Sequence, residues 1–431
     1  MNKKIEGDSA SAQEAKVERH LQEQFSVLTV IGGVYGFYRS PRWSIISYSM
    51  YITMYTCSFL ISADLLYSSI VLRNNISLFT VAFHAFLINC VVLTGSVSLT
   101  LQRRRTTEFL YNFDFTGYWT EYQESKFFVT LEAQSRRRIL QLLILFLSGY
   151  CACGMIGVVG PFVDMRLGID ENVTNVTGIY WKGLPFAMWW PFDAHKSTIS
   201  WISCFMCQGL WASFAPLMCT SAIILCFNSC EKLLNHMKLL IYAIEHLDLR
   251  AKNIFKKKFK YVTPDKQGIE YDDCYYECIV QNVKHHQKIV KAIDDFMILA
   301  NYAIAVPFFG GGLLLGLAGL NILSRDDPRV GPKLFCASLG MTEALNMLLL
   351  CVYGEKFQHE GEKLFTSIMY TKWYTRSLKC RKALMILQCG TLRPVKITAA
   401  KLIVLNMATF ANLTNSAYSI FNLNSVVSSG E

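Results

Sequence analysis

Few side chains in this sequence have the types and spacing that catalysis or metal binding needs. Cys204 and Cys207 form a Cys-x-x-Cys pair inside an apolar stretch, but no further ligands are spaced to complete a zinc site. His285 and His286 lie in a charged helical segment, where solvated surface or contact between helices is the ordinary role of histidine. Nucleophile elbows, phosphate-binding loops and paired carboxylates are missing from the sequence. It therefore predicts no enzyme, no cofactor and no metal.

Two acidic residues, Asp64 and Glu343, fall inside apolar stretches. A charged side chain in hydrocarbon is costly, so such residues face other helices or water and are functional candidates. We expect Asp64 to face the helix bundle or to lie near the outer surface. For Glu343, a structural hydrogen bond to a neighbouring helix is an equally good interpretation.

The last apolar stretch, residues 397–421, is long enough to cross a bilayer but unusually polar for a membrane span. Gly390 and Pro394 mark a helix end and a new start before it. Because polar groups avoid lipid, its polar residues predict contact with other helices or with water, as in a pore. The polar stripe consists of Asn412, Asn415, Ser419 and Asn422.

The composition is typical of a membrane protein with several spans, since 52% of the 431 residues are apolar and only 17% are charged. Six further apolar runs have membrane length, at residues 43–72, 78–101, 139–163, 199–227, 296–323 and 334–353. The sequence therefore predicts an all-α polytopic membrane protein with seven transmembrane helices. The first 20 residues contain no apolar core for a signal peptide, so we expect a soluble N-terminal tail.

The distribution of Lys and Arg predicts the orientation in the membrane. With the N-terminus in the cytoplasm, the cytoplasmic segments hold 34 of the 42 basic residues and the outer loops hold 7. Three glycosylation sequons, at Asn75, Asn172 and Asn175, also fall in the predicted outer loops. Seven spans then place the C-terminus outside the cell, opposite to a G-protein-coupled receptor.

The net charge of +10 is therefore mainly a signal of topology, with some attraction to anionic lipid of the inner leaflet. The basic run at residues 256–260 borders a membrane span, which argues against nucleic-acid binding. The 15 cysteines are scattered through spans and cytoplasmic loops and indicate small apolar residues in a reducing compartment.

These patterns divide the chain into consecutive segments. Residues 1–42 form a cytoplasmic tail with a short helix, and residues 43–353 form six transmembrane helices with cytoplasmic extensions at 228–295. Residues 354–393 are expected to form one amphipathic cytoplasmic helix, the anchor helix. Residues 394–425 form the seventh span, and residues 426–431 an extracellular tail.

The C-terminal third resembles the insect odorant receptors. The matching residues are Cys351-x-x-Gly354-Glu355, Glu362, Tyr370-x-x-Trp373, Pro394 and Ser416-Ala417-Tyr418-Ser419-x-Phe421, with weaker matches at Trp190-Pro191-Phe192-Asp193 and from Tyr275 to Ile289. The family's shared co-receptor (Orco) has a longer second cytoplasmic loop and a different ending. The chain therefore resembles an odour-tuning subunit.

The resemblance implies four subunits around a central cation pore, assembled with the co-receptor in the plasma membrane of an olfactory neuron dendrite. Matching the family's pore-lining positions places Phe421, Asn424 and Ser425 at the constriction, and the polar stripe is then assigned to contacts between helices. Tyr370 and Trp373, spaced i and i+3 on the anchor helix, are expected to hold a subunit contact.

In this family the ligand is a small volatile molecule that binds in the outer half of the bundle. The aromatic outer loop, residues 164–198, is either a set of membrane-interface anchors or a lid over that site. Gly154 serves either the pocket or helix packing. The candidate wall comprises Phe83, His84, Leu87, Tyr150, Gly154, Val158, Cys207, Trp211 and Phe309.

Two other classes compete with a channel. A G-protein-coupled receptor would need its N-terminus outside, and the Asp-Arg-Tyr and Asn-Pro-x-x-Tyr motifs are missing. A transporter would be expected to carry interrupted helices at matching places in two halves of the chain, and the sequence has no such pair.

Overall fold

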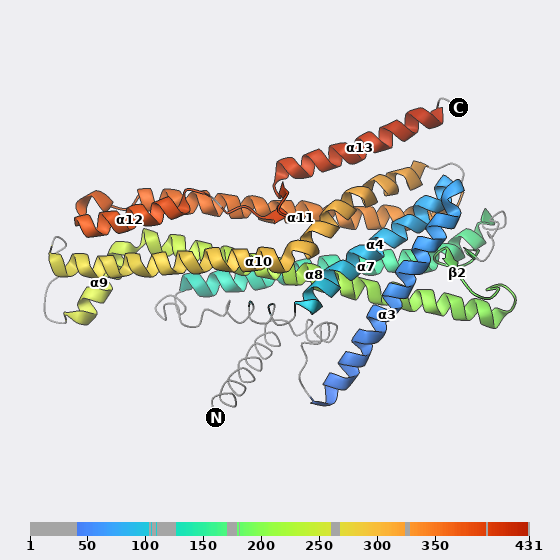
Figure 1. Ribbon diagram of the computed structural model, residues 1–431, viewed down its shortest axis with the longest axis horizontal. Coiled ribbons are helices and arrows are strands. Elements are labelled where there is room, and N and C mark those ends of the chain that lie inside the picture. Colours follow the sequence, from blue (N-terminus) through green and yellow to red (C-terminus); the bar gives the residue numbers. More distant parts are fainter. Residues whose placement is uncertain are drawn as a thin grey trace.

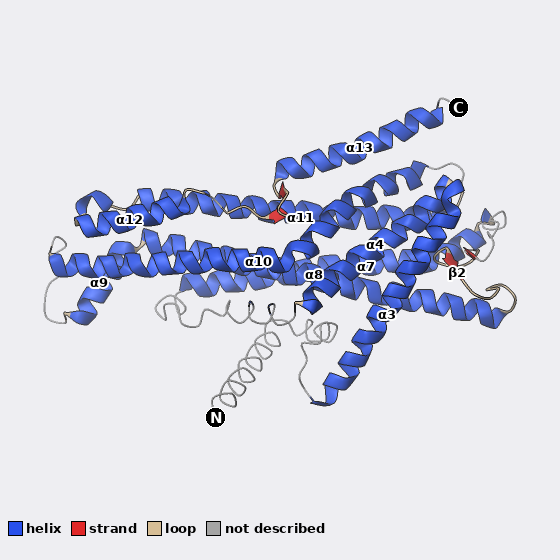
Figure 2. Cartoon of the chain, viewed as in Figure 1, coloured by secondary structure: helices blue, strands red, loops and turns tan. Residues whose placement is uncertain are grey.

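The computed structural model describes residues 41–102, 105, 109, 126–169, 179–180, 182–259, 268–323, 328–393 and 395–429. They form an elongated helical bundle with two short hairpins (Figures 1 and 2). The tail at 1–40, Asn172 and Asn175 lie outside the described residues. The elements are α3 (Pro41–Val71), η2 (Leu72–Asn74), α4 (Ile76–Leu101), α7 (Lys126–Arg166), β1 (Ile179–Tyr180), β2 (Met188–Trp189), α8 (Thr198–Glu245), α9 (Leu247–Lys258), α10 (Ile269–Leu323), α11 (Val330–Met369), η4 (Trp373–Thr375), α12 (Leu378–Thr391), β3 (Thr398–Ala399), β4 (Ile403–Val404) and α13 (Met407–Ser429).

Six helices of the described chain, α3, α4, α7, α8, α10 and α11, are long and apolar enough to cross a membrane. They coincide with six of the expected spans, so the all-α membrane fold is confirmed. The polar α13 is not one of these six, and its role as a seventh span stays a prediction. Of the sequons, Asn75 is exposed just before α4, where its Oδ1 accepts a hydrogen bond from Leu78 N at 3.2 Å.

The longest helices extend well beyond the thickness of a bilayer, as the helical pattern of residues 228–295 predicts. α8 has 48 residues and α10 has 55, whereas about 20 suffice for a span. Their extensions pack with α9 and α12 at the end of the molecule that we call the anchor end (Figure 1). The opposite end carries β1 and β2.

The anchor segment differs from the single helix expected over 354–393. α11 continues from its apolar half to Met369, the chain turns, and α12 runs back beside α10 and α11 (Figure 1). Tyr370 therefore follows the end of α11 and Trp373 begins η4, so the two aromatic residues do not share a helical face. Both are exposed, at 84% and 46% of their surface.

Arg376 lies just before α12 and connects this segment to α9 and α10 at the anchor end. No pattern in the sequence singled it out. Its buried guanidinium forms ion pairs with Asp248 and, at 3.7 Å, with Asp272. It also lies 4.5 Å from the centre of the Tyr275 ring. Burial raises the pKa of the nearby Cys380 thiol, which keeps it protonated as a donor to the Asp272 carbonyl at 3.4 Å.

α13 leaves the bundle after the β3–β4 hairpin and stands apart from it over most of its length (Figure 1). Asn412, Asn415 and Ser419 of the polar stripe are exposed in the single subunit, so they do not pack against its other helices. Their assignment to contacts with helices of other subunits stays a prediction. The side chains of Phe421, Asn422, Asn424 and Ser425 lie outside the described set, although their backbone belongs to α13.

Candidate functional site

A small apolar cavity lies between α4, α7, α8 and α11, in the half of the bundle away from the anchor end. Its volume is about 40 Å³, little more than the volume of one water molecule in the liquid. The cavity is therefore almost filled by its own wall residues in this conformation. Its walls are Ile88, Asn89, Val92, Tyr150, Cys153, Gly154, Phe186, Trp211, Ala212, Ala215, Pro216, Cys219, Phe335 and Leu339.

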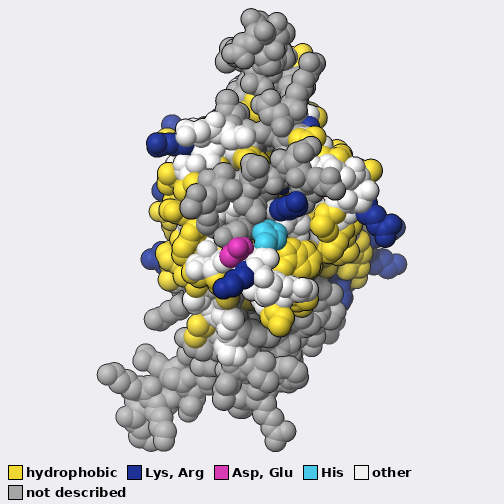
Figure 3. Space-filling model, turned by 90° about the vertical axis from the view of Figure 1, so that its right-hand side faces the viewer, with side chains coloured by type: hydrophobic (Ala, Val, Ile, Leu, Met, Phe, Trp, Pro, Cys, Tyr) yellow, Lys and Arg dark blue, Asp and Glu magenta, His cyan; other side chains and the backbone are white. Residues whose placement is uncertain are grey.

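The segment 182–190, which we call the lid, reaches this cavity through Phe186. Phe186 of the lid is buried, and its ring meets Trp211 and Phe335 edge-on at centroid distances of 5.0 and 5.4 Å. Buried Gln208 of α8 binds Phe186 at both backbone groups, accepting from its N–H at 3.0 Å and donating to its carbonyl at 3.1 Å. Hydrophobic, Lys and Arg side chains intermingle on this end of the molecule (Figure 3).

Asp64 of α3 holds the part of the lid that contains β2. Its half-buried carboxylate accepts hydrogen bonds from Trp189 N at 3.2 and 3.3 Å. Trp189 belongs to β2, which pairs with β1 in an antiparallel hairpin. The acidic residue predicted to face the bundle or the outer surface therefore holds the lid to α3.

The polar groups that reach the cavity already have partners in the protein. Trp211 Nε1 donates to Asn89 Oδ1 at 3.3 Å, and Asn89 in turn donates to Ser62 Oγ at 2.7 Å. Tyr150 Oη donates to Glu343 Oε1 at 2.5 Å, so Glu343 makes the hydrogen bond between helices that one of its interpretations anticipates. A ligand in this cavity would therefore be recognised mainly by shape and dispersion.

The structure brings together three of the nine candidate wall residues, Tyr150, Gly154 and Trp211. Cys207 and Phe309 are exposed on the outside of the subunit. Their neighbours in sequence, Gln208 and Phe308, are buried. The remaining four do not line the cavity: His84 is fully buried, whereas Phe83, Leu87 and Val158 are half-buried.

Gly154 serves packing as well as the cavity wall. A Cβ atom added there would lie 2.8 Å from the carbonyl oxygen of Ala212 on α8. Because both atoms belong to packed helices, even an alanine would force α7 and α8 apart. Both interpretations of Gly154 therefore hold, and a large substitution there would not probe the cavity alone.

Residue-by-residue reasoning missed the polar and lid residues of the site. Asn89 and Gln208 are polar side chains inside apolar spans, a signal that marks functional positions in membrane helices. Phe186 had no comparable signal, because the aromatic residues of its loop look alike in the sequence. Its insertion depends on the fold of the lid.

Comparisons with known proteins agree with this architecture. The structure of the insect olfactory receptor OR5 from Machilis hrabei in complex with eugenol superposes with a TM-score of 0.74, at 15% identity over 95% of this chain and 99% of that chain. Another structure of that receptor superposes with a TM-score of 0.68, at 13% identity over 94% and 98%. The fold is therefore shared.

Sequence relatives point the same way. Odorant receptor 23a of Drosophila melanogaster is 23% identical over 243 residues, which are 56% of this chain and 58% of that receptor. Odorant receptor 33a of the same species is 23% identical over 145 residues, 34% of this chain and 38% of the receptor. The 7tm Odorant receptor family matches residues 75–418. The protein thus belongs to the 7tm Odorant receptor family, whose members are membrane receptors and not enzymes.

Proposed function

We propose that this protein is an odour-tuning subunit of a ligand-gated cation channel in the plasma membrane of an olfactory neuron. A small apolar volatile molecule enters the cavity beneath the lid and opens a pore lined by α13. Co-receptor subunits complete a tetramer, with contacts at the anchor end. The ligand must enlarge the cavity, since about 40 Å³ is far below the few hundred Å³ typical of ligand pockets.

The observation that carries this proposal is the continuity of α11 from the cavity to the start of α13. Phe335 and Leu339 line the cavity near one end of the helix. Further along, Gly354 abuts Leu405 so closely that an added Cβ would lie 2.1 Å from its carbonyl oxygen. Glu355 Oε2 accepts a hydrogen bond from Met407 N, the first residue of α13, at 3.4 Å. Displacement of α11 by a ligand would therefore move the base of α13.

A buried aromatic row offers a second link between the cavity and the same region. Tyr150 lies 6.3 Å from Phe146, Phe146 lies 6.0 Å from Phe227, and Phe227 lies 5.1 Å from Tyr353, all between ring centroids. Tyr353, the residue before Gly354, donates a hydrogen bond from its Oη to Glu231 at 2.7 Å. Close-packed rings transmit a displacement because their volume cannot change.

Direct gating is tested in excised membrane patches from cells that express the full chain with the co-receptor. Apolar volatiles of graded length, with eugenol as one probe, should evoke cation currents in nucleotide-free solution. Cells with either subunit alone provide the controls. Responses that need G protein and nucleotide would overturn the proposal in favour of a metabotropic receptor.

A further inference from the structure

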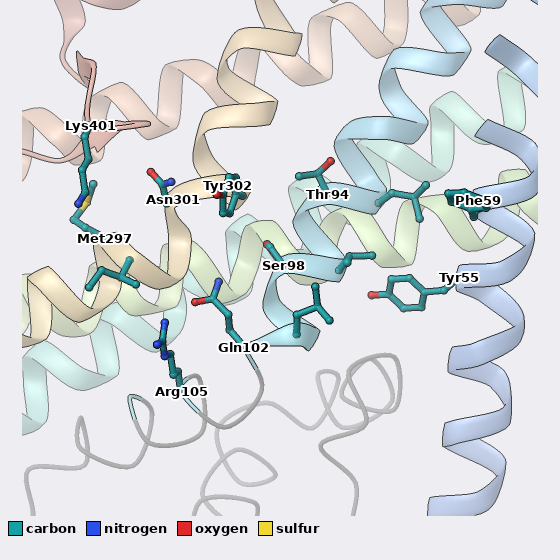
Figure 4. Close-up of a pocket in the computed structure, with 14 residues that line it drawn as sticks. Tyr55, Phe59, Thr94, Ser98, Gln102, Arg105, Met297, Asn301, Tyr302 and Lys401 are labelled. Atoms are coloured by element: carbon teal, nitrogen blue, oxygen red, sulfur yellow. The ribbon is translucent and has the colours of Figure 1, made fainter. Parts of the chain in front are cut away.

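A second hollow lies on the outside of the bundle across α3, α4 and α10, on another face of α4 from the small cavity (Figure 4). It is an open groove with a volume of about 830 Å³. Its lining is mostly apolar and includes the exposed side chains of Phe59, Leu101 and Ile298. Exposed apolar groups beside membrane spans meet lipid, so the groove has the surface properties of an acyl-chain site.

Two cations, Lys401 and Arg105, belong to the lining of this apolar groove. Lys401 reaches from the β3–β4 turn toward Met297 of α10, and Arg105 lies beyond the end of α4, near Gln102 (Figure 4). Among the described residues, neither cation has a carboxylate within 4.0 Å. Their charge is therefore available to an anion from outside the chain.

The turn that carries Lys401 has an unusual backbone. Ala400 and Lys401 have φ of 53° and 59°, and Leu402 N donates to Ala399 O at 3.0 Å to close the turn. Glycine or asparagine adopts this left-handed region at lower cost than lysine. The hairpin holds Lys401 in that conformation, with its side chain directed toward Met297 (Figure 4).

We propose that this groove binds an anionic glycerophospholipid of the cytoplasmic leaflet. The phosphate lies at the rim with Lys401 and Arg105, and an acyl chain follows Phe59, Leu93 and Val97. The groove lies at the end of α4 and the middle of α10, beside the segments 101–138 and 228–291 that the charge asymmetry assigns to the cytoplasmic side. That leaflet is rich in anionic lipid, which basic residues near the surface attract.

The test uses the purified full-length chain in phosphatidylcholine nanodiscs. A phosphatidylserine with a photoactivatable acyl chain is titrated in, cross-linked and mapped by mass spectrometry, and the matching phosphatidylcholine probe is run in parallel. We expect the serine probe to label segments 93–105 and 297–302 several-fold more strongly. Lys401→Asn, which suits the left-handed turn, and Arg105→Gln should each weaken this labelling about fivefold, and the double variant about 25-fold.

Lys401→Arg should restore the labelling, because it returns the charge. Lys396→Gln is the matched control, since Lys396 is an exposed lysine close to the hairpin that does not line the groove. Equal labelling by both lipids, or labelling that neither substitution changes, would overturn the proposal. Cross-links in the groove to a second protein subunit in place of lipid would do so too. The measurement involves no odorant, so its failure is separate from a failure of the proposed channel function.

Discussion

Ala215 is the residue through which the size of the proposed odorant cavity can best be changed. It lines the cavity on α8 and is half-buried. We expect Ala215→Val to shift the response toward shorter ligands, because valine adds two carbon atoms to the wall and each methylene of misfit is worth about 1–3 kcal/mol. Dose–response curves over a length-graded panel measure the change. Gly209→Ala on the same helix is the control, since its added Cβ would meet nothing within 4 Å.

Gln208 governs the lid through its two hydrogen bonds to the backbone of Phe186. Gln208→Leu has nearly the same shape but leaves a buried N–H and carbonyl without partners, at a cost of about 1–3 kcal/mol. Hydrogen exchange across residues 182–190 should therefore become roughly tenfold faster or more. Exposed Cys207→Ser is the neighbouring control. Unchanged exchange in the Gln208 variant would mean that other contacts hold the lid.

At the scale of elements, α11 is the proposed link between ligand and gate, and Gly354 contacts Leu405 just before α13. Gly354→Ala places a Cβ in a site that backbone atoms of Leu405 already occupy. We expect smaller maximal currents for every odorant, with the rank order of ligands preserved, since the cavity is untouched. Currents are normalised to surface expression.

Gly95→Ala is the matched control for the Gly354 variant, because its added Cβ would make an ordinary 3.6 Å contact with Ala222. A change in ligand rank order in the Gly354 variant, with normal maximal current, would contradict the role of α11 as the link. Loss of surface expression in both variants would indicate a general intolerance of α4 and α11 to added volume.

At the scale of the whole molecule, the exposed aromatic side chains at the α11–α12 turn are the candidate assembly surface. Trp373→Ala should reduce co-purification with the co-receptor and lower the current to all odorants, because buried aromatic anchors contribute roughly 2 kcal/mol or more at interfaces. Exposed Met385→Ala on α12 is the control. Selective loss of some odorant responses, with assembly intact, would rule the assembly role out.

The orientation of the whole molecule is tested with terminal tags. A tag before Met1 should be labelled only in permeabilised cells, and a tag after Glu431 in intact cells, because 34 of 42 basic residues fall in the predicted cytoplasmic segments. Labelling of the N-terminal tag on intact cells would end the channel proposal.

The sequence by itself determined the membrane class and six helical spans, because apolar length is a local property that needs no tertiary information. It also marked Asp64 and Glu343 as residues that avoid lipid, since a charged side chain in hydrocarbon is costly. The family was recognisable because its motif residues lie close together in the last third of the chain.

Only the tertiary structure decided which helix faces enclose the cavity. Cys207 and Gln208 are adjacent in sequence but point about 100° apart on a helix, so one is exposed and the other holds the lid. The break after Met369 likewise follows from packing, since the return of α12 seats Arg376 between Asp248, Asp272 and Tyr275. Such choices depend on contacts between residues far apart in the chain, and periodicity alone does not contain them.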